Sequence, residues 1–130
     1  MKNIIIDVFM TIPNSAPIFA AAMSLSFAAV AETPPTYKAS PDIYKIIQEN
    51  EKFRVIEGTW QPGQKDAMHS HEPFVIHWIT DCQLSASLPD GKSIEGTQKA
   101  GTTQIKPAVP GHIATNAGKT VCKALFVEAK

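Results

Sequence analysis

The feature that most constrains the fold is a pair of histidines, His69 and His71, separated by one residue. Successive side chains of a β-strand point to opposite faces, so residues i and i+2 share a face and both imidazoles can reach one point. Further along the chain, the stretch 101–107, followed by His112 and Asn116, offers a completion of this half-site. Together the two stretches predict a barrel that holds one metal ion.

Composition limits the classes of protein that remain. The 130 residues are 44% hydrophobic and 18% charged, which is typical of one folded domain and not of a disordered chain. Twelve basic residues balance twelve acidic residues, and no basic run stands out. Nucleic acids and anionic membranes are therefore not expected as partners.

The N-terminal residues 1–31 are typical of a secretory signal peptide. Residues 18–30 are apolar and small, and a small-x-small pattern ends at Ala31. The apolar run is too short to span a bilayer, which takes about 20 residues. Lys2 is the one basic residue of the stretch before it, which is few for a signal and leaves a start at Met10 open. A buried N-terminal helix is the alternative, although two prolines would interrupt it. We expect a periplasmic or secreted protein.

The remaining chain divides into a leader and a domain. Residues 32–42, with Pro34 and Pro35, predict an extended and exposed leader, and residues 43–130 form the domain. A short helix and a strand fit residues 44–48 equally well. Further strands are expected at residues 53–60, 75–80, 83–88, 93–98, 103–105, 113–116 and 121–128. Gly91 marks a tight hairpin turn. Many short strands punctuated by Gly and Pro predict an all-β sandwich or barrel.

At residues 43–130 the chain resembles the cupin superfamily. The resemblance rests on two motifs, Gly63-x5-His69-x-His71 and Gly101-x5-Pro107-x4-His112-x3-Asn116. It implies a small, single-domain, cupin-type jelly-roll β-barrel with a metal in its mouth. The chain departs from the family where a glutamate usually follows the second histidine, because those positions hold Val75 and Ile76.

The resemblance implies His69, His71 and His112 as metal ligands. Three neutral imidazoles suit a divalent transition metal such as Fe, Zn, Ni, Cu or Mn and leave coordination positions open. Glu72 and His77 are spare ligands. Glu72 has the wrong strand parity, and His77 points inward only if the family glutamate corresponds to Val75; otherwise it is a packed or surface histidine. Asn116 is expected to form hydrogen bonds near the site without ligating.

Two cysteines, Cys82 and Cys122, remain. An even count in an exported protein favours a disulfide. In the jelly roll that the resemblance implies, the strand that ends near Cys82 and the strand that starts near Cys122 are antiparallel neighbours. We therefore expect these two residues to be bonded.

Two classes of function stay open. The first is a metal-dependent enzyme with an oxygenase-like or isomerase-like reaction on a small molecule. The second is a non-catalytic module that binds a small ligand or the metal, or that works metal-free. The lack of a recognisable acid or base besides the histidines favours this second class. The expected partner is a small molecule, with no membrane contact after signal cleavage, and a homodimer is left open. No catalytic residue and no organic cofactor are predicted.

Overall fold

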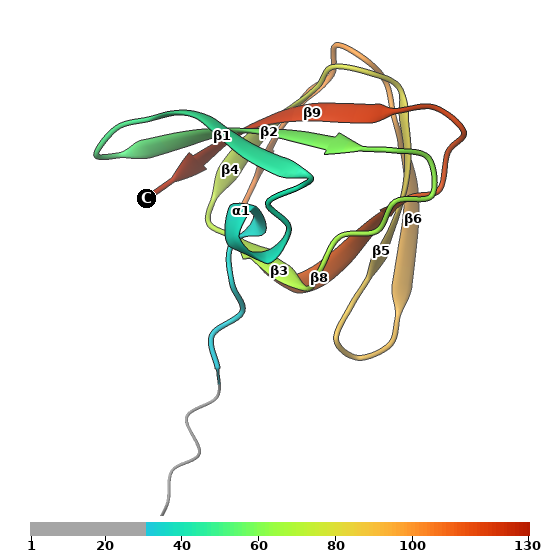
Figure 1. The fold of residues 1–130 in the computed structure, drawn as a ribbon, viewed down its shortest axis with the longest axis horizontal. Coiled ribbons are helices and arrows are strands. Elements are labelled where there is room, and N and C mark those ends of the chain that lie inside the picture. Colours follow the sequence, from blue (N-terminus) through green and yellow to red (C-terminus); the bar gives the residue numbers. More distant parts are fainter. Residues whose placement is uncertain (1–30) are drawn as a thin grey trace, which may run out of the picture. The chain divides into compact units, whose positions relative to one another are not determined.

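The structure is a computed structural model that describes residues 31–130. The predicted signal peptide falls on residues that lie outside this part, apart from its last residue. Apart from the four-residue helix α1, every secondary-structure element of the described chain is a β-strand (Figure 1). Its elements are α1 (Thr36–Ala39), β1 (Tyr44–Glu49), β2 (Phe53–Trp60), β3 (His69–His71), β4 (Phe74–Trp78), β5 (Cys82–Ser87), β6 (Ser93–Gln98), β7 (Thr103–Lys106), β8 (Val109–Asn116) and β9 (Cys122–Ala129).

The strands form two sheets that face each other in Figure 1. One sheet has five strands in the order β1-β2-β9-β4-β7, and the other has four in the order β3-β8-β5-β6. All pairs of neighbouring strands are antiparallel. Many of the neighbours lie far apart in sequence, as in a jelly roll. The predicted all-β jelly-roll fold is confirmed.

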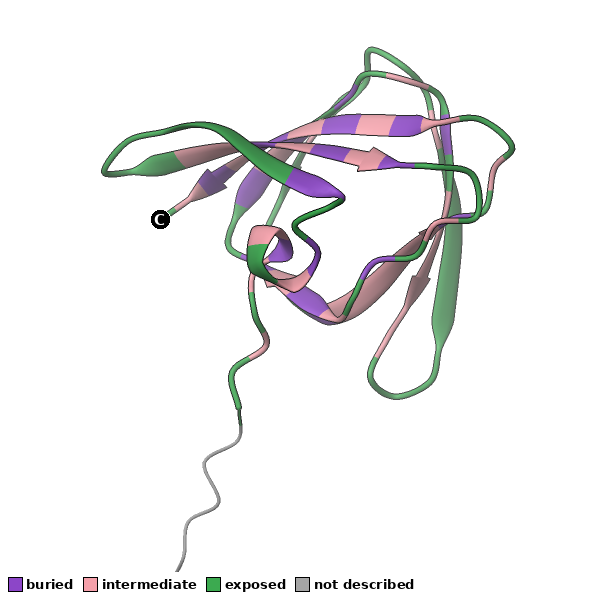
Figure 2. Cartoon of the chain, in the orientation of Figure 1, coloured by how far each residue is buried: buried purple, intermediate pink, exposed green. Residues whose placement is uncertain are grey.

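β9 shows why these residues fold as strands. Its side chains alternate between buried and half-buried along the whole strand (Figure 2). The inward positions are Cys122, Ala124, Phe126 and Glu128. A period of two fits a strand with one face on the core and does not fit a helix. β9 lies between β2 and β4, so it forms the middle of the larger sheet.

Most of the predicted strands agree with the structure to within a few residues. The structure decides one segment that the sequence leaves ambiguous, and it moves the start of one strand. Residues 44–48, for which helix and strand were equally plausible, form strand β1 and pair with β2. The strand predicted at residues 113–116 begins earlier, at Val109. Pro110 and Gly111 conceal this start in the sequence, because both residues are rare in strand interiors.

The prediction of an extended, exposed leader at residues 32–42 is wrong in part. The segment contains α1, and both Thr36 and Ser40 are buried. The segment docks on β3 and on the residues just before it: the Ser70 amide donates to the Pro34 carbonyl at 3.0 Å, and the Ala67 amide donates to Ser40 Oγ at 2.8 Å. Within residues 31–130, no helix is both long and apolar enough to cross a bilayer.

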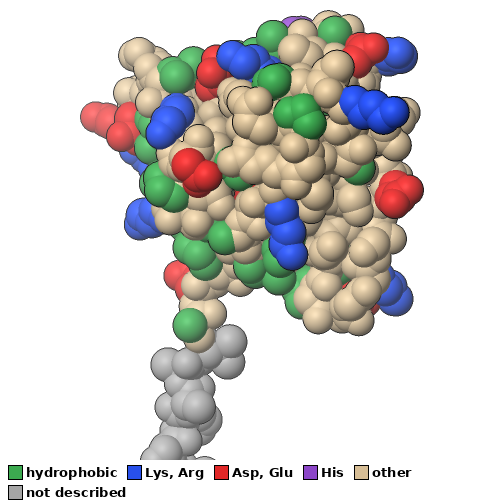
Figure 3. All heavy atoms as spheres, turned by 45° about the vertical axis from the view of Figure 1, so that its right-hand side comes forward, with side chains coloured by type: hydrophobic (Ala, Val, Ile, Leu, Met, Phe, Trp, Pro, Cys, Tyr) green, Lys and Arg blue, Asp and Glu red, His purple; other side chains and the backbone are tan. Residues whose placement is uncertain are grey.

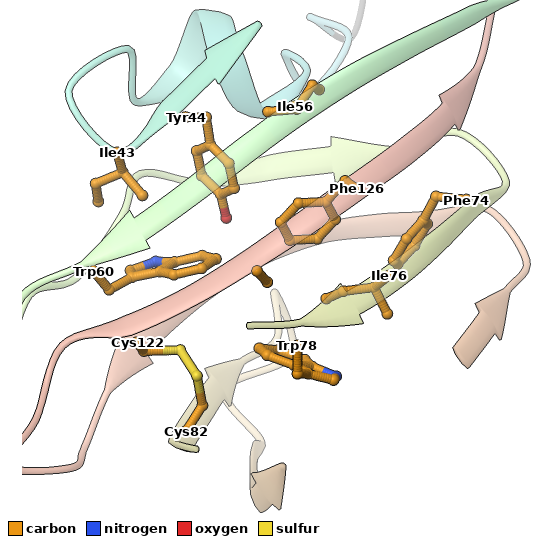
Figure 4. Close-up of a cluster of buried hydrophobic side chains, with 11 residues drawn as sticks. Ile43, Tyr44, Ile56, Trp60, Phe74, Ile76, Trp78, Cys82, Cys122 and Phe126 are labelled. Atoms are coloured by element: carbon orange, nitrogen blue, oxygen red, sulfur yellow. A yellow bond between two sulfur atoms is a disulfide. The ribbon is translucent and has the colours of Figure 1, made fainter. Parts of the chain in front are cut away.

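Aromatic side chains dominate the core between the sheets (Figure 4). Tyr44 packs edge-on against Trp60, with ring centroids 5.2 Å apart, and both rings approach Phe126. Gly58 makes room for these rings, because a Cβ there would lie 2.9 Å from the Trp60 ring and 3.0 Å from Phe126. The remaining members of the core are Ile43, Ile56, Phe74, Ile76, Trp78, Cys82, Cys122 and Ala124.

A disulfide between Cys82 and Cys122 joins the two sheets (Figure 4). Their Cα atoms lie 5.1 Å apart, at the first residue of β5 and the first residue of β9. The resemblance implied that the strands next to the two cysteines are antiparallel neighbours. This is so for β4, which Cys82 follows, and β9. The predicted pairing is confirmed.

Removing this bond should destabilise the fold. The disulfide closes a loop across a sequence separation of 40, and such a loop stabilises by about 3–4 kcal/mol in the chain-entropy model. We expect the double variant Cys82→Ala/Cys122→Ala to lose that much free energy of unfolding in a denaturant titration. Added reductant should lower the wild-type midpoint and leave the variant unchanged. Equal midpoints for the wild type with and without reductant would contradict the prediction.

Candidate metal centre

The pairing of β3 with β8 brings three histidines together. His69 on β3 lies directly opposite His112 on β8, and His71 lies on the same face of β3 as His69. One potential ligand nitrogen from each residue lies within 4.8 Å of the other two. The ring centroids of His69 and His112 are 4.3 Å apart, and those of His69 and His71 are 5.0 Å apart.

A register shift in this pair of strands positions His112. His69 pairs with His112, but His71 pairs with Val109, so β8 carries one residue more than β3 over this span. A bulge of this kind re-aims a side chain next to a site. Pro110 suits the bulge because it has no amide to offer the ladder. Gly111 allows close packing, since a Cβ there would lie 3.1 Å from Met68 Sδ, which would have to shift.

Each of the three imidazoles is held through its Nδ1 atom. His69 Nδ1 lies 2.9 Å from the Ala67 carbonyl oxygen, and His112 Nδ1 lies 3.1 Å from the Pro110 carbonyl oxygen. His71 Nδ1 lies 2.6 Å from Glu128 Oε1. Carbonyl and carboxylate oxygens only accept, so each Nδ1 carries a proton, and in the neutral form of each ring Nε2 keeps the lone pair. The three Nε2 atoms are therefore the ones available to an ion.

The protonation state of His112 also fits a ligand. Burial, together with the charge of His69, lowers the pKa of His112 to about 4. At neutral pH the ring is therefore uncharged, which is the state that binds a metal. Three imidazoles that each present Nε2 fit zinc, iron, copper or nickel and leave room for a further ligand.

Two carboxylates and a tyrosine that the sequence did not single out support these rings. Glu128 is buried and binds His71, as the carboxylate partners of metal-bound histidines do. Asp66 is buried next to His69, with 3.5 Å between Asp66 Oδ1 and His69 Nδ1. Tyr44 donates its hydroxyl proton to Asp66 Oδ2 at 2.8 Å. The one sequence signal for Glu128 is its position in the alternating pattern of β9, which places it on the buried face.

These groups have shifted pKa values. Burial would raise the pKa of Asp66, but His69, the Ala114 amide and the Tyr44 hydroxyl together hold it below its usual range. Burial and the charge of Asp66 raise the pKa of Tyr44 well above its ordinary value. Asp66 is thus an anion and Tyr44 a neutral donor at neutral pH. The Tyr44 hydroxyl also lies 3.4 Å from His69 Nε2.

The spare ligands do not join the cluster. Glu72 and His77 are exposed. The hypothesis that His77 points inward is wrong, because Phe74, Ile76 and Trp78 form the buried face of β4. His77 Nδ1 contacts Thr103 Oγ1 at 2.8 Å on the outer face.

Asn116 has the hydrogen-bonding role predicted for it. Its Nδ2 donates to the carbonyl oxygens of Trp60, at 3.1 Å, and Thr120, at 2.8 Å. Its Oδ1 accepts from the Gly118 amide at 3.0 Å. Asn116 fixes the loop between β8 and β9 and is not part of the histidine cluster.

A cavity of about 300 Å³ opens beside the histidines. His71 and His112 form part of its wall, and Tyr44 contributes its ring. The rest of the wall is mainly apolar: Trp60, Phe74, Ile76, Trp78, Leu84, Ala86, Val109, Ala114 and Phe126, with Gln98, Gln104 and Lys106 as polar members. Ile76, which stands where the family can have its glutamate, is one of the apolar side chains.

Solved structures show which fold this is. A cupin domain from Bordetella pertussis Tohama I aligns with a TM-score of 0.63 and 22% identity, over 78% of this chain and 99% of that one. The chain has the cupin fold. This cupin-fold chain also aligns with an uncharacterized conserved protein with a double-stranded β-helix domain from Klebsiella pneumoniae, with a TM-score of 0.51 and 22% identity over 67% and 75% of the two chains. No protein-family model and no curated protein matches the sequence.

A third neighbour is named as an enzyme. The polyketide cyclase RemF from Streptomyces resistomycificus aligns with a TM-score of 0.52 and 18% identity, over 66% of this chain and 63% of that one. Identities of this size show the fold alone. The cupin resemblance that the two histidine motifs carried is confirmed at this level.

Replacing Glu128 should weaken metal binding without removing a ligand. Glu128→Gln keeps an acceptor for His71 Nδ1 but removes the negative charge, and loss of such a partner costs about 10- to 100-fold in metal affinity. We expect a loss near tenfold for Zn²⁺, measured by competition with a chromophoric chelator. Glu72→Gln, an exposed glutamate, is the matched control. Equal affinities for both variants would contradict a role for Glu128.

Replacing His112 should remove a ligand and little of the core. We expect His112→Ala to lose more metal affinity than Glu128→Gln does, while the metal-free variant melts close to the metal-free wild type, because the aromatic core is intact. Metal content by mass spectrometry and thermal unfolding check the two parts. His77→Ala serves as the control histidine. Unchanged metal content in His112→Ala would contradict the site.

Proposed function

We propose that the chain binds one divalent transition metal through His69, His71 and His112 and binds a small molecule at the positions that these ligands leave open. The observation that carries the proposal is that the three imidazole rings are hydrogen-bonded in the same way. Each Nδ1 is engaged by an oxygen acceptor, which leaves three Nε2 lone pairs. A bound metal would supply Lewis-acid chemistry and open coordination positions.

The protein's own groups would order a small molecule in the cavity. Trp60, Phe74 and Phe126 offer apolar contact, and Tyr44 lines the same space with its hydroxyl held by Asp66. With its pKa raised, Tyr44 keeps its proton at neutral pH. This environment supports an oxygenase-like or isomerase-like enzyme. One protein with the same fold is named as a polyketide cyclase, so we retain catalysis among the proposed functions.

A non-catalytic binding module is the second candidate, and one observation favours it. Among residues 31–130, the two buried carboxylates near the cluster are engaged, Asp66 by Tyr44 and Glu128 by His71. No carboxylate lines the described cavity. A general acid or base would then have to come from Tyr44, Lys106 or a histidine, and of these the sequence indicated only the histidines.

Export is part of the proposal. A signal peptide cleaved after Ala31 would place the protein in an oxidising compartment, where the Cys82–Cys122 disulfide is stable. We expect intact-mass analysis of the protein from its native host to show a mature N-terminus at Glu32. A mature N-terminus at Met1 or Met10 would contradict export by this signal.

The expectation that nucleic acid is not a partner stays a prediction. On the face shown in Figure 3, basic and acidic side chains are interspersed, and neither sign forms a continuous patch. A balanced surface gives no attraction to a polyanion.

Metal analysis separates the candidates. The mature protein, reconstituted at neutral pH with Fe²⁺, Zn²⁺, Ni²⁺, Cu²⁺ or Mn²⁺ in turn, should bind one ion per chain. Oxygen uptake and product analysis with small thiols, phenols and diketones then tests for turnover. Uptake that requires His112 supports the enzyme, and metal or ligand binding without turnover supports the module. A protein that binds none of these metals would overturn the metal site.

A further inference from the structure

The cavity has two polar ends separated by an apolar middle. Strand β4 runs along its wall from Phe74 to Trp78, a rise of about 13 Å for four residues. His71 stacks on Phe74 with ring centroids 4.6 Å apart, so the histidine cluster lies at the Phe74 end. Trp78 is at the other end, beyond Ile76 (Figure 4).

The Phe74 end has a cationic group on the cavity wall, whereas the nearby Glu128 carboxylate is already engaged by His71. Lys106 on β7 pairs with Phe74 across the ladder and lines the cavity. Among residues 31–130, Lys106 forms no ion pair, and no carboxylate lines this cavity. A free ammonium group beside the histidines favours an anionic group on the ligand, such as a carboxylate or an enolate.

The Trp78 end has unused hydrogen-bonding groups. Trp78 Nε1 is buried and has no hydrogen-bond partner within the described residues, and Figure 4 shows it at the end of the indole away from the disulfide. A buried donor without a partner calls for an explanation. Gln104 lies opposite Ile76 in the ladder, one inward-facing position before Trp78, and its Nε2 donates to Gln98 Oε1 at 3.1 Å. This bond leaves the Gln104 oxygen and the Gln98 amide nitrogen for a further partner. Such a set suits a hydroxyl or carbonyl oxygen.

The middle of the cavity suits a flat ring system. Its walls include the rings of Trp60, Phe74, Trp78 and Phe126, and aromatic rings favour stacked or edge-on contact with another ring. The cavity of about 300 Å³ is twice the roughly 150 Å³ apolar cavity that admits benzene. Two fused rings fit this volume.

We propose that the cavity binds a small two-ring aromatic anion, with its anionic group at Lys106 and the histidines and a second oxygen at Trp78, Gln98 and Gln104. The inference rests on the proposed function only where the metal shares the anionic group. The contacts to Lys106 and to the Trp78 end involve the protein alone. The metal-free protein can therefore be used to test it.

The probe is 6-hydroxy-2-naphthoate, which carries a carboxylate and a hydroxyl at opposite ends of two rings. 2-Naphthoate lacks the hydroxyl, and 2-naphthol lacks the carboxylate. Calorimetric titration of metal-free protein should give an affinity for 6-hydroxy-2-naphthoate that is about five- to tenfold higher than for 2-naphthoate, the size of one hydrogen bond. 2-Naphthol should bind more weakly than either naphthoate.

Three variants locate the two ends. Gln104→Met keeps the size of the side chain and Trp78→Phe keeps an aromatic ring, while each removes a polar group. Each should bring the ratio of the two naphthoate affinities towards one. A purely structural role would change stability and leave that ratio intact. Lys106→Gln should weaken both naphthoates equally and leave 2-naphthol unchanged.

The outcomes separate this proposal from the metal site. Equal affinity of the wild type for the two naphthoates, no binding of either, or a ratio that persists in both Trp78→Phe and Gln104→Met overturns the inference. The same titrations with the Zn²⁺-treated protein report on the proposed function. A protein that takes up no Zn²⁺ but keeps the affinity ratio supports the ligand class and rejects the metal. Metal uptake with a ratio of one rejects the ligand class alone.

Discussion

The candidate site depends on the register of β3 against β8. A shift of one residue in either strand would turn the side chains that now meet to opposite faces. His69 and His112 meet because they are partners in the ladder, and His71 joins them because it lies on the same face of β3 as His69. The leader adds to this arrangement, since α1 and the residues on either side of it hold β3 from the outside. The rings are thus placed by backbone hydrogen bonds before any ion binds.

Burying two carboxylates beside an aromatic core is costly unless they are paired. Asp66 accepts from Tyr44 and the Ala114 amide, and Glu128 accepts from His71. The same hydrogen bonds that make these charges tolerable also fix the orientation of the rings. Structural stability and readiness for a ligand are therefore coupled in this barrel. A substitution that removes His71 would leave Glu128 as an unpaired buried anion, so it would disturb the fold more than His112→Ala does.

The sequence predicted the fold class, most strands and the disulfide because each has a local signal or a matching motif. Alternating burial marks β9, and the spacing of the two histidine motifs carried the cupin resemblance. The sequence did not distinguish strand from helix at β1, where the pairing of Tyr44 with Gly58 favours the strand. It missed Asp66 and Glu128, since a carboxylate gives no sign in the sequence of which distant side chain it will meet. It also misplaced the leader, whose burial arises from contacts with residues far along the chain.

The central claim is that three imidazoles bind one ion, and X-ray absorption at the metal edge of the Zn²⁺-loaded protein tests it most directly. The account predicts three imidazole nitrogens at about 2.0–2.1 Å from zinc, completed by oxygen. The same measurement on His112→Ala should show one imidazole fewer. A first shell made mainly of oxygen, or a spectrum that His112→Ala leaves unchanged, would contradict the account.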